Sequence, residues 1–424
     1  GFFTTDAHGK EMFMWYFPAG DGNASAPLII WLQGGPGGSS LFGLFSEMGP
    51  LVVDSKGDAH VRDVSWAKNY QMLFIDNPVG AGFSYTHGAS GYCEGERCVA
   101  KNLLALLDQF YAVFTQAARV PLYITGESYG GHYVPAFAHE IHKRNSAISA
   151  GAANRRFGGA GTAAGTGLIP LRGIAIGDGW VDPVNMVPAY PELFLNLGLM
   201  DTQQFRRAQD YSTRTVEHIK KEEFTAAFEV WDEFLNADIY PYSSFFHNAT
   251  GLNDYDNYLN TDAPAALGYF GVFLEKPGTR AAIHVGNRPF NDGSECEKHL
   301  LADFMVSLRP ELQVLLESDK YDVLVYSGNL DVIIAAPLTE RMLQKLEWSG
   351  AAAFQSSPKA IWRVQEADEE VAGYVRSAGR LTHAVVRGAG HLVPFDQPER
   401  ALDLITRFIE RKPFPNLPNP AKAP

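Results

Sequence analysis

The stretch that most constrains the fold runs from residue 122 to residue 131 and reads LYITGESYGG. Its first four residues are apolar or strand-forming. Apolar residues then recur at helical spacing at Val134, Phe137, Ala138 and Ile141. A strand, a Gly-x-Ser-x-Gly turn and a helix together form a sharp turn that lifts a serine hydroxyl clear of a sheet edge. The N-terminus of the helix directs free N–H groups at negative charge beside that hydroxyl. The stretch therefore predicts Ser128 as a nucleophile.

The five-residue pattern alone is a weak signal, because the chain has 41 glycines and the pattern can arise by chance. The strand before it and the helix after it make a chance match much rarer. A nucleophilic serine also needs a base, an acid that orients the base, and donors for an oxyanion. The rest of the sequence has to supply these groups.

Further apolar runs alternate with segments of helical spacing. Residues 12–17, 28–33, 72–76, 173–179, 322–326 and 382–387 are predicted strands, and residues 100–114 and 399–410 are predicted helices. Several runs are almost wholly apolar, as expected for strands buried on both faces of a sheet. Strands alternating with helices predict an α/β fold with a mostly parallel central sheet. Asp396 is expected to cap the closing helix, with Pro398 near its first turn.

The length of 424 residues favours more than one simple core. After Asp182 the pattern changes to helical stretches such as 224–235, and no buried strand run returns until Tyr321. We expect an inserted, mostly helical cap over residues 182–300, between two parts of one core formed by residues 1–181 and 301–424. Residues 145–167 are dominated by Gly, Ala, Ser and Asn, which predicts a flexible surface loop.

The composition excludes several classes of function. A formal net charge of −13 disfavours nucleic acid or an anionic membrane as the main partner. The same charge fits an acidic working compartment, and it fits plain solubility equally well. No apolar run reaches the length of a membrane span, and no cationic-then-apolar leader is present. Since the chain starts at Gly1 without Met, we expect a mature or trimmed form.

Cysteines and glycosylation sequons point to the secretory route. Cys93 and Cys98 are close enough for a small loop disulfide, which would leave Cys296 unpaired. We expect no metal site, because two thiols without a nearby His give too few ligands. Asn23 and Asn248 begin sequons in polar, turn-like stretches, although such triplets also occur in cytosolic proteins.

Two later predicted strands each end in a candidate partner for Ser128. Asp331 follows DVLVYSGNL, and His391 follows THAVVRGAG. In an α/β-hydrolase the order is Ser, then acid, then His, each at the carboxyl end of a strand. His391 would take the serine proton and return it to the leaving amine, while Asp331 would hold the imidazole tautomer. Taken singly, the two residues could be a structural histidine and a turn residue, but three strand ends in the required order favour a triad.

A glycine-rich loop, GGPGGSS, follows the predicted strand 28–33. Successive N–H groups without side chains can converge on a tetrahedral oxygen, so we assign an oxyanion hole to the N–H groups of Gly35 and Tyr129. The alternatives are a plain turn or a phosphate cradle. No Lys-Ser/Thr follows, which excludes a P-loop.

These motifs carry a resemblance that spans nearly the whole chain. WLQGGPGGSSLFGLFSEMGP, GESYGGHYVP, GIAIGDGWVDP, SGNLD and RGAGHLVPFDQPERA together resemble serine carboxypeptidases. Gln33 and Gly38, with IHVGN and VAGYVR, look most like the vitellogenic-like subgroup. The resemblance implies an α/β-hydrolase with a helical cap. It implies release of single amino acids from peptide or protein C-termini through an acyl-enzyme, without metal or cofactor. The sequence leaves a homodimer open, and a lysosomal, vacuolar or extracellular location is expected.

Two rival functions remain at this point. An acyltransferase or esterase would use the same acyl-enzyme, because the acyl group can pass to another nucleophile. A binding or protective partner protein would keep the three residues without using them.

The resemblance also implies a site for the free carboxylate of the substrate. The matching positions are Trp31, Gln33, Gly34, Glu47 and Glu127. Carboxyl groups repel a carboxylate unless they are protonated, and close acids in a dry pocket have raised pKa values. A protonated Glu127 that shares its proton with Glu47 could donate to the substrate, which predicts activity favoured at acidic pH.

Two departures from the wider family bear on specificity. Gln33 stands where many relatives have Asn, which shifts the amide by one methylene. Gly38 stands where many relatives have a cysteine that ties this loop to the cap, which predicts a less tethered cap. By position, Phe42, Ser46 and Leu392 are expected to border the leaving-residue pocket.

Overall fold

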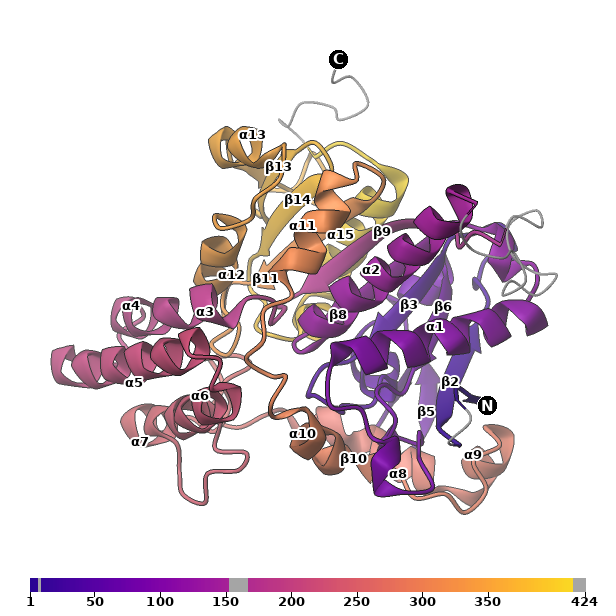
Figure 1. The fold of residues 1–424 in the computed structure, drawn as a ribbon, viewed down its shortest axis with the longest axis horizontal. Helices are drawn as coiled ribbons and strands as arrows, with labels where there is room; N and C mark the ends of the chain where they lie inside the picture. Colours follow the sequence, from indigo (N-terminus) through magenta and orange to yellow (C-terminus); the bar gives the residue numbers. More distant parts are fainter. Residues whose placement is uncertain (7–8, 152–166, 415–424) are drawn as a thin grey trace.

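A ten-stranded sheet forms the centre of the molecule (Figure 1), in a computed structural model that describes residues 1–6, 9–151 and 167–414. The strands lie in the order β1 Phe2–Thr4, β2 Glu11–Phe17, β6 Gln71–Ile75, β3 Leu28–Leu32, β8 Leu122–Glu127, β9 Leu171–Gly177, β11 Asp322–Gly328, β14 Leu381–Val386, β13 Gly373–Ala378 and β12 Ala360–Trp362. The six strands from β6 to β14 are parallel, and antiparallel strands extend the sheet at both edges. The prediction of a mostly parallel sheet is confirmed.

The two faces of the sheet carry separate apolar cores. Every residue of β3, β6 and β8 is buried, as expected for strands that are covered on both sides. One core packs alternate strand residues against α1 Glu96–Val113, α2 Gly130–Ser149 and α11 Arg309–Glu317. The other core packs the remaining strand residues against α15 Pro398–Glu410. The parallel strands are thereby fixed with their carboxyl ends at one edge.

The chain between β9 and β11 is largely helical. It contains α3 Pro183–Met186, α4 Tyr190–Asn196, α5 Thr202–Lys220, α6 Phe224–Trp231, α7 Phe245–Thr250, α8 Tyr269–Glu275, α9 Pro277–Ala282, α10 Ser294–Leu300 and α11, with the two-residue strand β10 Asn291–Asp292 paired to β7 Ala81–Gly82. In Figure 1, α4 to α7 project from one side of the sheet. The cap boundaries at residues 182 and 300 remain a prediction.

Two expectations about local structure need correction. Helix α2 continues through Ser149, so the beginning of the expected loop 145–167 is helical, and residues 152–166 lie outside the described residues. Asp396 does not cap the closing helix, because it ends the short helix α14 Val393–Asp396. Its carboxylate instead accepts hydrogen bonds from Gly390 N–H and Asn257 Nδ2, at 2.7 and 2.9 Å. The cap position belongs to Gln397, with Pro398 as the first helical residue.

Several short elements had no sequence prediction. They are β1, β12, β13, a hairpin of β4 Leu51–Val53 and β5 Ala59–Val61, and the helices α12 Ala336–Leu343 and α13 Ala351–Ser356. Most of them are too short or too mixed in composition to give a clear periodic apolar pattern, so they depend on their neighbours for definition.

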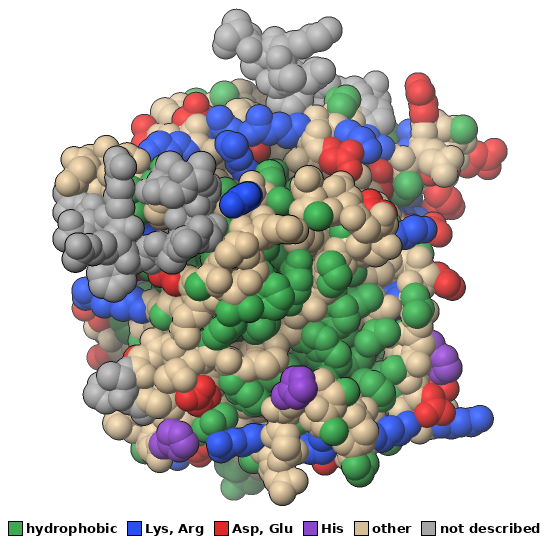
Figure 2. Space-filling model, turned by 90° about the vertical axis from the view of Figure 1, so that its right-hand side faces the viewer, with side chains coloured by type: hydrophobic (Ala, Val, Ile, Leu, Met, Phe, Trp, Pro, Cys, Tyr) green, Lys and Arg blue, Asp and Glu red, His purple; other side chains and the backbone are tan. Residues whose placement is uncertain are grey.

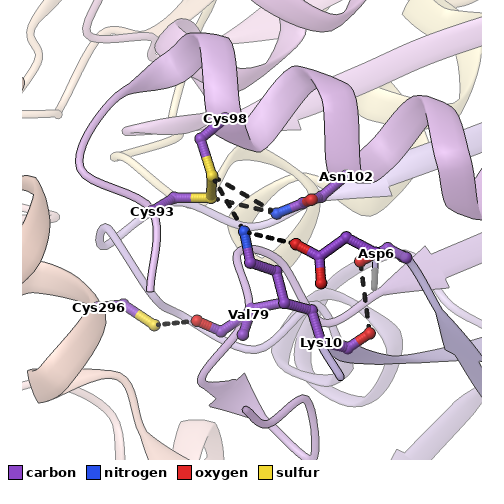
Figure 3. The surroundings of a disulfide bond; sticks show 8 residues. Asp6, Lys10, Val79, Cys93, Cys98, Asn102 and Cys296 are labelled. Atoms are coloured by element: carbon purple, nitrogen blue, oxygen red, sulfur yellow. Dashed lines mark hydrogen bonds and ion pairs between the residues drawn. A yellow bond between two sulfur atoms is a disulfide. The ribbon is translucent and has the colours of Figure 1, made fainter. Parts of the chain in front are cut away.

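The expected disulfide joins Cys93 and Cys98, whose Cα atoms are 5.5 Å apart, and Cys296 is a buried free cysteine (Figure 3). Around the disulfide, Lys10 Nζ lies 3.5 Å from Cys98 Sγ, and the amide of Asn102 donates to Cys93 Sγ at 3.2 Å. The thiol of Cys296 donates to the carbonyl oxygen of Val79 at 3.3 Å. The sequence-based pairing is confirmed. Among the described helices, none combines the length and apolarity that a membrane crossing requires.

Candidate active site

Ser128 occupies the sharp turn between β8 and α2. Its φ of 61° lies in the left-handed region, which costs a non-glycine residue about 1–2 kcal/mol. Its N–H donates to Gly177 O at 3.1 Å, and its carbonyl accepts from the N–H groups of Gly131 and Trp180, each at 2.9 Å. A Cβ on Gly131 would lie 2.5 Å from Trp180 N, so only glycine fits at that position. These contacts hold the strained turn and present the side chain at the carboxyl edge of the sheet.

His391 and Asp331 meet in the loops that follow β14 and β11. His391 Nδ1 donates to Asp331 Oδ2 at 2.9 Å, and both side chains are buried. The other carboxylate oxygen, Oδ1, accepts from Ile334 N–H at 3.0 Å. The backbone N–H of His391 donates to Asp256 O at 2.6 Å. Because Nδ1 serves Asp331, Nε2 is left as the ring nitrogen that can exchange a proton.

Ser128 and His391 line the same cavity of about 590 Å³. Among the hydrogen bonds of the described residues, none joins Ser128 Oγ to the His391 ring. Hydrogen bonds of this kind are often long without substrate and tighten when it binds. The structure therefore brings the three predicted residues to one place and pairs two of them directly.

The glycine-rich loop packs against the serine turn. A Cβ on Gly34 would lie 2.5 Å from Ser128 Cβ and 2.6 Å from Tyr129 N, so a side chain there would separate the two segments. Gly35, with a φ of 115°, follows in a conformation that favours glycine. Neither Gly35 N–H nor Tyr129 N–H has an acceptor among the hydrogen bonds of the described residues. Two free N–H groups beside Ser128 are the donor set that an oxyanion requires.

Four of the five residues predicted to bind a carboxylate form a connected chain beside Ser128. Trp31 Nε1–H donates to Gln33 Oε1 at 2.8 Å, and Gln33 Nε2–H donates to Glu127 Oε1 at 3.0 Å. The carboxyl group of Glu127 in turn lies beside that of Glu47, close enough for each to shift the pKa of the other. Gln33, Gly34 and Glu127 line the cavity, whereas Trp31 and Glu47 lie behind it. Glu47 ends the π-helix Gly43–Glu47 and is fully buried, so it is no surface acid.

Burial decides the protonation of this carboxyl pair. Burial raises the pKa of Glu47 to about 7, against smaller lowering contributions from its hydrogen bonds and from the charges of His391 and Arg62. Burial and the charge of Glu47 together raise the pKa of Glu127 well above its usual value. Both oxygens of Glu47 and Oε2 of Glu127 are buried without a donor from the described residues. A proton held by the pair supplies the missing hydrogen bond.

The charge of His391 depends on the acids around it. Burial alone lowers the pKa of His391, but the negative charges of Asp331, Asp256 and Glu47 outweigh burial and raise the pKa to about 9. An imidazole that is already protonated cannot accept the serine proton. Burial also raises the pKa of Asp256 to about 6, so this acid takes up a proton as the pH falls. Each acid that is neutralised weakens the field on His391 and lowers its pKa, because the titrations are linked.

Of the residues expected to border the leaving-residue pocket, Phe42 and Leu392 line the cavity. Ser46 is buried and donates to Leu267 O at 3.3 Å instead of lining the cavity. Without a cysteine at Gly38, the loop still touches the helical region, because a Cβ on Gly37 would lie 2.7 Å from both Gly293 O and Cys296 Cβ. Close backbone packing makes this contact in place of a disulfide.

The two sequons lie on the surface. Asn23 is exposed in the turn between β2 and β3, and Asn248 is exposed within α7. Asn248 also borders a cavity of about 850 Å³ among the helices, which contains none of the other predicted site residues.

Three acids near the site, of which Asp76 and Asp178 are buried, had no role in the sequence-based prediction. Asp76 directly follows β6. Its carboxylate accepts hydrogen bonds from Ser39 Oγ at 2.5 Å and from Phe83 N–H at 2.8 Å, and the bond to Ser39 fixes the glycine-rich loop. Asp178 follows β9 and lies beside Asp331. Asp256 lines the cavity beside His391. Asp76 and Asp178 directly follow buried strands, and this position in the sequence was the signal that could have marked them as site residues. No sequence pattern marks Asp256.

The oxygens of Asp178 and Asp331 and a ring nitrogen of His391 lie within 4.8 Å of one another, a spacing that a cation could also bridge. The expectation of a site without metal therefore stays a prediction.

Comparison with solved structures defines the class of fold. The crystal structure of Kex1(delta)p, a prohormone-processing carboxypeptidase from Saccharomyces cerevisiae, superposes with a TM-score of 0.76 at 22% identity, covering 97% of this chain and 90% of that chain. With its parallel sheet, covering helices and serine turn, the molecule has an α/β-hydrolase fold.

Sequence comparison defines the family. The family model described as serine carboxypeptidase matches residues 1–411. The mouse protein named probable serine carboxypeptidase CPVL is 43% identical over 410 residues, which cover 96% of this chain and 82% of that protein. The venom serine carboxypeptidase of Apis mellifera is 41% identical over 417 residues, covering 98% and 84%. The vitellogenic carboxypeptidase of Aedes aegypti is 36% identical over 416 residues, covering 97% and 83%. The chain belongs to the serine carboxypeptidase family, hydrolases that act on peptide bonds, and the resemblance is confirmed.

Proposed function

We propose that this serine carboxypeptidase releases single amino acids from free peptide C-termini at acidic pH, with Ser128, His391 and Asp331 as its triad. The observation that carries the proposal is the buried carboxyl pair, Glu47 and Glu127. The pair lies beside the serine turn, where the amide of Gln33 donates a hydrogen bond to Glu127. A protonated carboxyl at that place can donate a hydrogen bond to the free carboxylate at the C-terminus of a substrate. An internal peptide bond has no such carboxylate.

The geometry supports a two-step reaction. Ser128 Oγ attacks the carbonyl carbon of the last peptide bond while its proton moves to His391 Nε2, and Asp331 stabilises the imidazolium. The tetrahedral oxygen accepts from the N–H groups of Gly35 and Tyr129. The C–N bond then breaks, the amine takes the proton from His391, and a free amino acid leaves. Water repeats the sequence on the acyl-enzyme and restores the serine.

Recognition of the C-terminus follows from the charges of the carboxyl pair. In its protonated form Glu127 donates to the substrate carboxylate, while Gln33 Nε2 holds Glu127 in place. As the pH rises through about 7, Glu47 ionises and the pair repels the substrate. Loss of affinity toward neutral pH should therefore be specific to substrates with a free carboxylate.

The decisive experiment uses a blocked dipeptide in two forms, with a free and with an amidated C-terminus, between pH 4 and pH 8. We expect free amino acid from the first form and an extra decline in kcat/KM on raising the pH that the amide lacks. Equal pH dependence of both forms would refute the carboxyl-pair proposal.

Labelling by an organophosphonate, mapped to Ser128, separates an enzyme from a protein with an idle triad. Transfer of the acyl group to an added alcohol, in preference to water, would indicate an acyltransferase.

We also propose a secretory-route location, in a lysosome or vacuole or outside the cell. The disulfide between Cys93 and Cys98, the exposed sequon residues Asn23 and Asn248, and the similarity to a venom carboxypeptidase support this location. Expression through a eukaryotic secretory pathway should give a product whose mass falls on treatment with an N-glycosidase. The N23Q/N248Q double variant should show no such fall.

A homodimer is a further proposal. Figure 2 shows an area of apolar side chains, bordered by polar atoms, on the side that lies at the right of Figure 1. Exposed apolar areas of this kind are common at contacts between proteins. Analytical ultracentrifugation over a range of concentrations should show a species of twice the chain mass of 46.5 kDa. A single species at the chain mass would refute it.

A further inference from the structure

Asp178 has a fully buried side chain at the carboxyl end of β9, and the mechanism above does not use it. Its φ of 41° is unusual for a residue other than glycine. Its N–H donates to Tyr326 O at 2.8 Å, and its Oδ1 accepts from Gly328 N–H at 2.8 Å. These bonds join the end of β9 to the end of β11, three residues before Asp331.

The carboxyl group of Asp178 lies beside the triad. One carboxyl oxygen of Asp178, one of Asp331 and a ring nitrogen of His391 lie within 4.8 Å of one another. Both oxygens of Asp331 already accept, one from His391 Nδ1–H and one from Ile334 N–H. Oδ2 of Asp178 is buried without a donor from the described residues. Two carboxyl groups can hydrogen-bond only if one holds a proton, and this donor-free oxygen is its natural position.

We propose that Asp178 is a positioning residue that stays protonated and donates a hydrogen bond from Oδ2 to the Asp331 carboxylate. Asp331 then receives three donors, from Asp178, His391 and Ile334, which fix its plane and hence the orientation of the imidazole. Asp178 therefore acts on the imidazole of His391 only through Asp331. The inference rests on the proposed triad.

The surroundings favour the protonated form. Burial and the charge of Asp331 raise the pKa of Asp178 well above its usual value, against the lowering effect of the Gly328 N–H bond. The charge of Glu47 acts in the same direction, and Glu127 and Tyr326 also lie close enough to interact. When Asp178 does ionise, its negative charge lies beside Asp331 and favours the protonated imidazole, which cannot act as a base.

The experiment measures the rate at which an uncharged fluorophosphonate labels Ser128, between pH 4 and pH 9, in three proteins. Because the probe has no carboxylate, Glu47 and Glu127 do not affect the labelling rate by binding a substrate carboxylate. Asp178→Asn keeps an acceptor for Gly328 N–H and supplies a permanent N–H donor to Asp331. We expect it to keep the wild-type rate at acidic pH and to retain that rate at least about one pH unit further toward alkaline pH.

Asp178→Ala loses the donor at every pH, so its labelling rate should fall about tenfold across the range. Ser327→Ala is the matched control, because it removes a buried hydrogen bond to Thr339 near the end of the neighbouring strand β11, outside the site. Its pH profile should match the wild type even if its Tm falls.

The results distinguish failure of the positioning role from failure of the proposed triad. If the profile of Asp178→Asn superimposes on the wild type, or if it falls like that of Asp178→Ala, the positioning role is wrong. If Asp178→Ala fails to fold, the comparison of wild type with Asp178→Asn still decides. Absence of Ser128 labelling in the wild type would instead refute the proposed triad. The His391 Nδ1–H proton resonance should move in Asp178→Ala and stay close to its wild-type position in Asp178→Asn at acidic pH.

Discussion

His391 Nδ1 and Asp331 Oδ2 are 2.9 Å apart, although 60 residues separate them in the chain. The contact forms because β11 and β14 are parallel neighbours, so the loops after them leave the same edge of the sheet. This geometry fixes the ring so that Nε2 is the nitrogen available to Ser128.

The contact between His391 and Asp331 predicts the effect of Asp331→Asn. An amide can donate to Nδ1 and would stabilise the wrong tautomer, which places a proton on Nε2. We expect kcat to fall by about 10⁴-fold with a small change in KM. Steady-state kinetics with the blocked dipeptide measure both constants. A loss below tenfold would show that Asp331 does not orient the base.

The closeness of Glu127 and Glu47 predicts a changed pH profile in Glu127→Gln. The amide keeps a donor for the substrate carboxylate at every pH, whereas the wild-type pair loses the proton of Glu47 as the pH rises through about 7 and then repels that carboxylate. One ionisation near pH 7 makes the wild type about tenfold weaker on free-acid peptides at pH 8, and the variant should lose far less. The amidated peptide is the control, and both proteins should treat it alike.

The position of Asp256 beside His391 predicts a shift of the acid limb of activity. The Asp256 charge favours the imidazolium, so Asp256→Asn should lower the pKa of His391. The enzyme would then stay active about one pH unit further into the acid range. The kcat/KM profile of an amidated substrate measures this limb without the carboxyl pair. A shift toward higher pH would contradict the assigned sign.

The carboxyl pair also predicts how stability depends on pH. The pKa of Glu47 is about 7 in the folded protein and near 4.5 when exposed, so between these values the folded state binds more protons than the unfolded state. Its contribution is complete below about pH 4.5 and is lost as the pH rises through about 7, amounting to about 3 kcal/mol. We expect Tm to fall over this window.

Glu47→Gln tests that assignment, because the amide does not titrate. Its Tm should fall less between pH 4.5 and pH 7.5 than that of the wild type, as measured by calorimetry. Equal slopes for the two proteins would show that other acids, such as Glu96 and Asp178, dominate the effect.

Long apolar strands and the helices between them were predictable because their periods are local. The runs that became β2, β3, β6, β8, β9, β11 and β14 lie within a few residues of their predicted bounds. Asp396 shows where this reasoning ends. The pattern before α15 matches a cap, but the contacts of its carboxylate with Gly390 and Asn257 come from distant residues.

The carboxyl pair and the acids around the triad show the same limit. Glu47 has no local feature that separates it from a surface acid, and only the resemblance to a family marked it. Its burial results from the π-helix Gly43–Glu47 packing behind the cavity. Asp256 lies in an irregular segment whose backbone binds His391, and no sequence pattern indicates that contact.

The sequence by itself determined the strands, the serine turn with its glycines, and the order of Ser128, Asp331 and His391. Backbone preference and apolar periodicity depend on neighbours a few residues away, so they can be read from the chain. Only the tertiary structure decided which acids hold protons. That property depends on burial and on charges brought together by parallel strands, and neither exists until Glu47, Glu127 and Asp178 lie at one edge of the folded sheet.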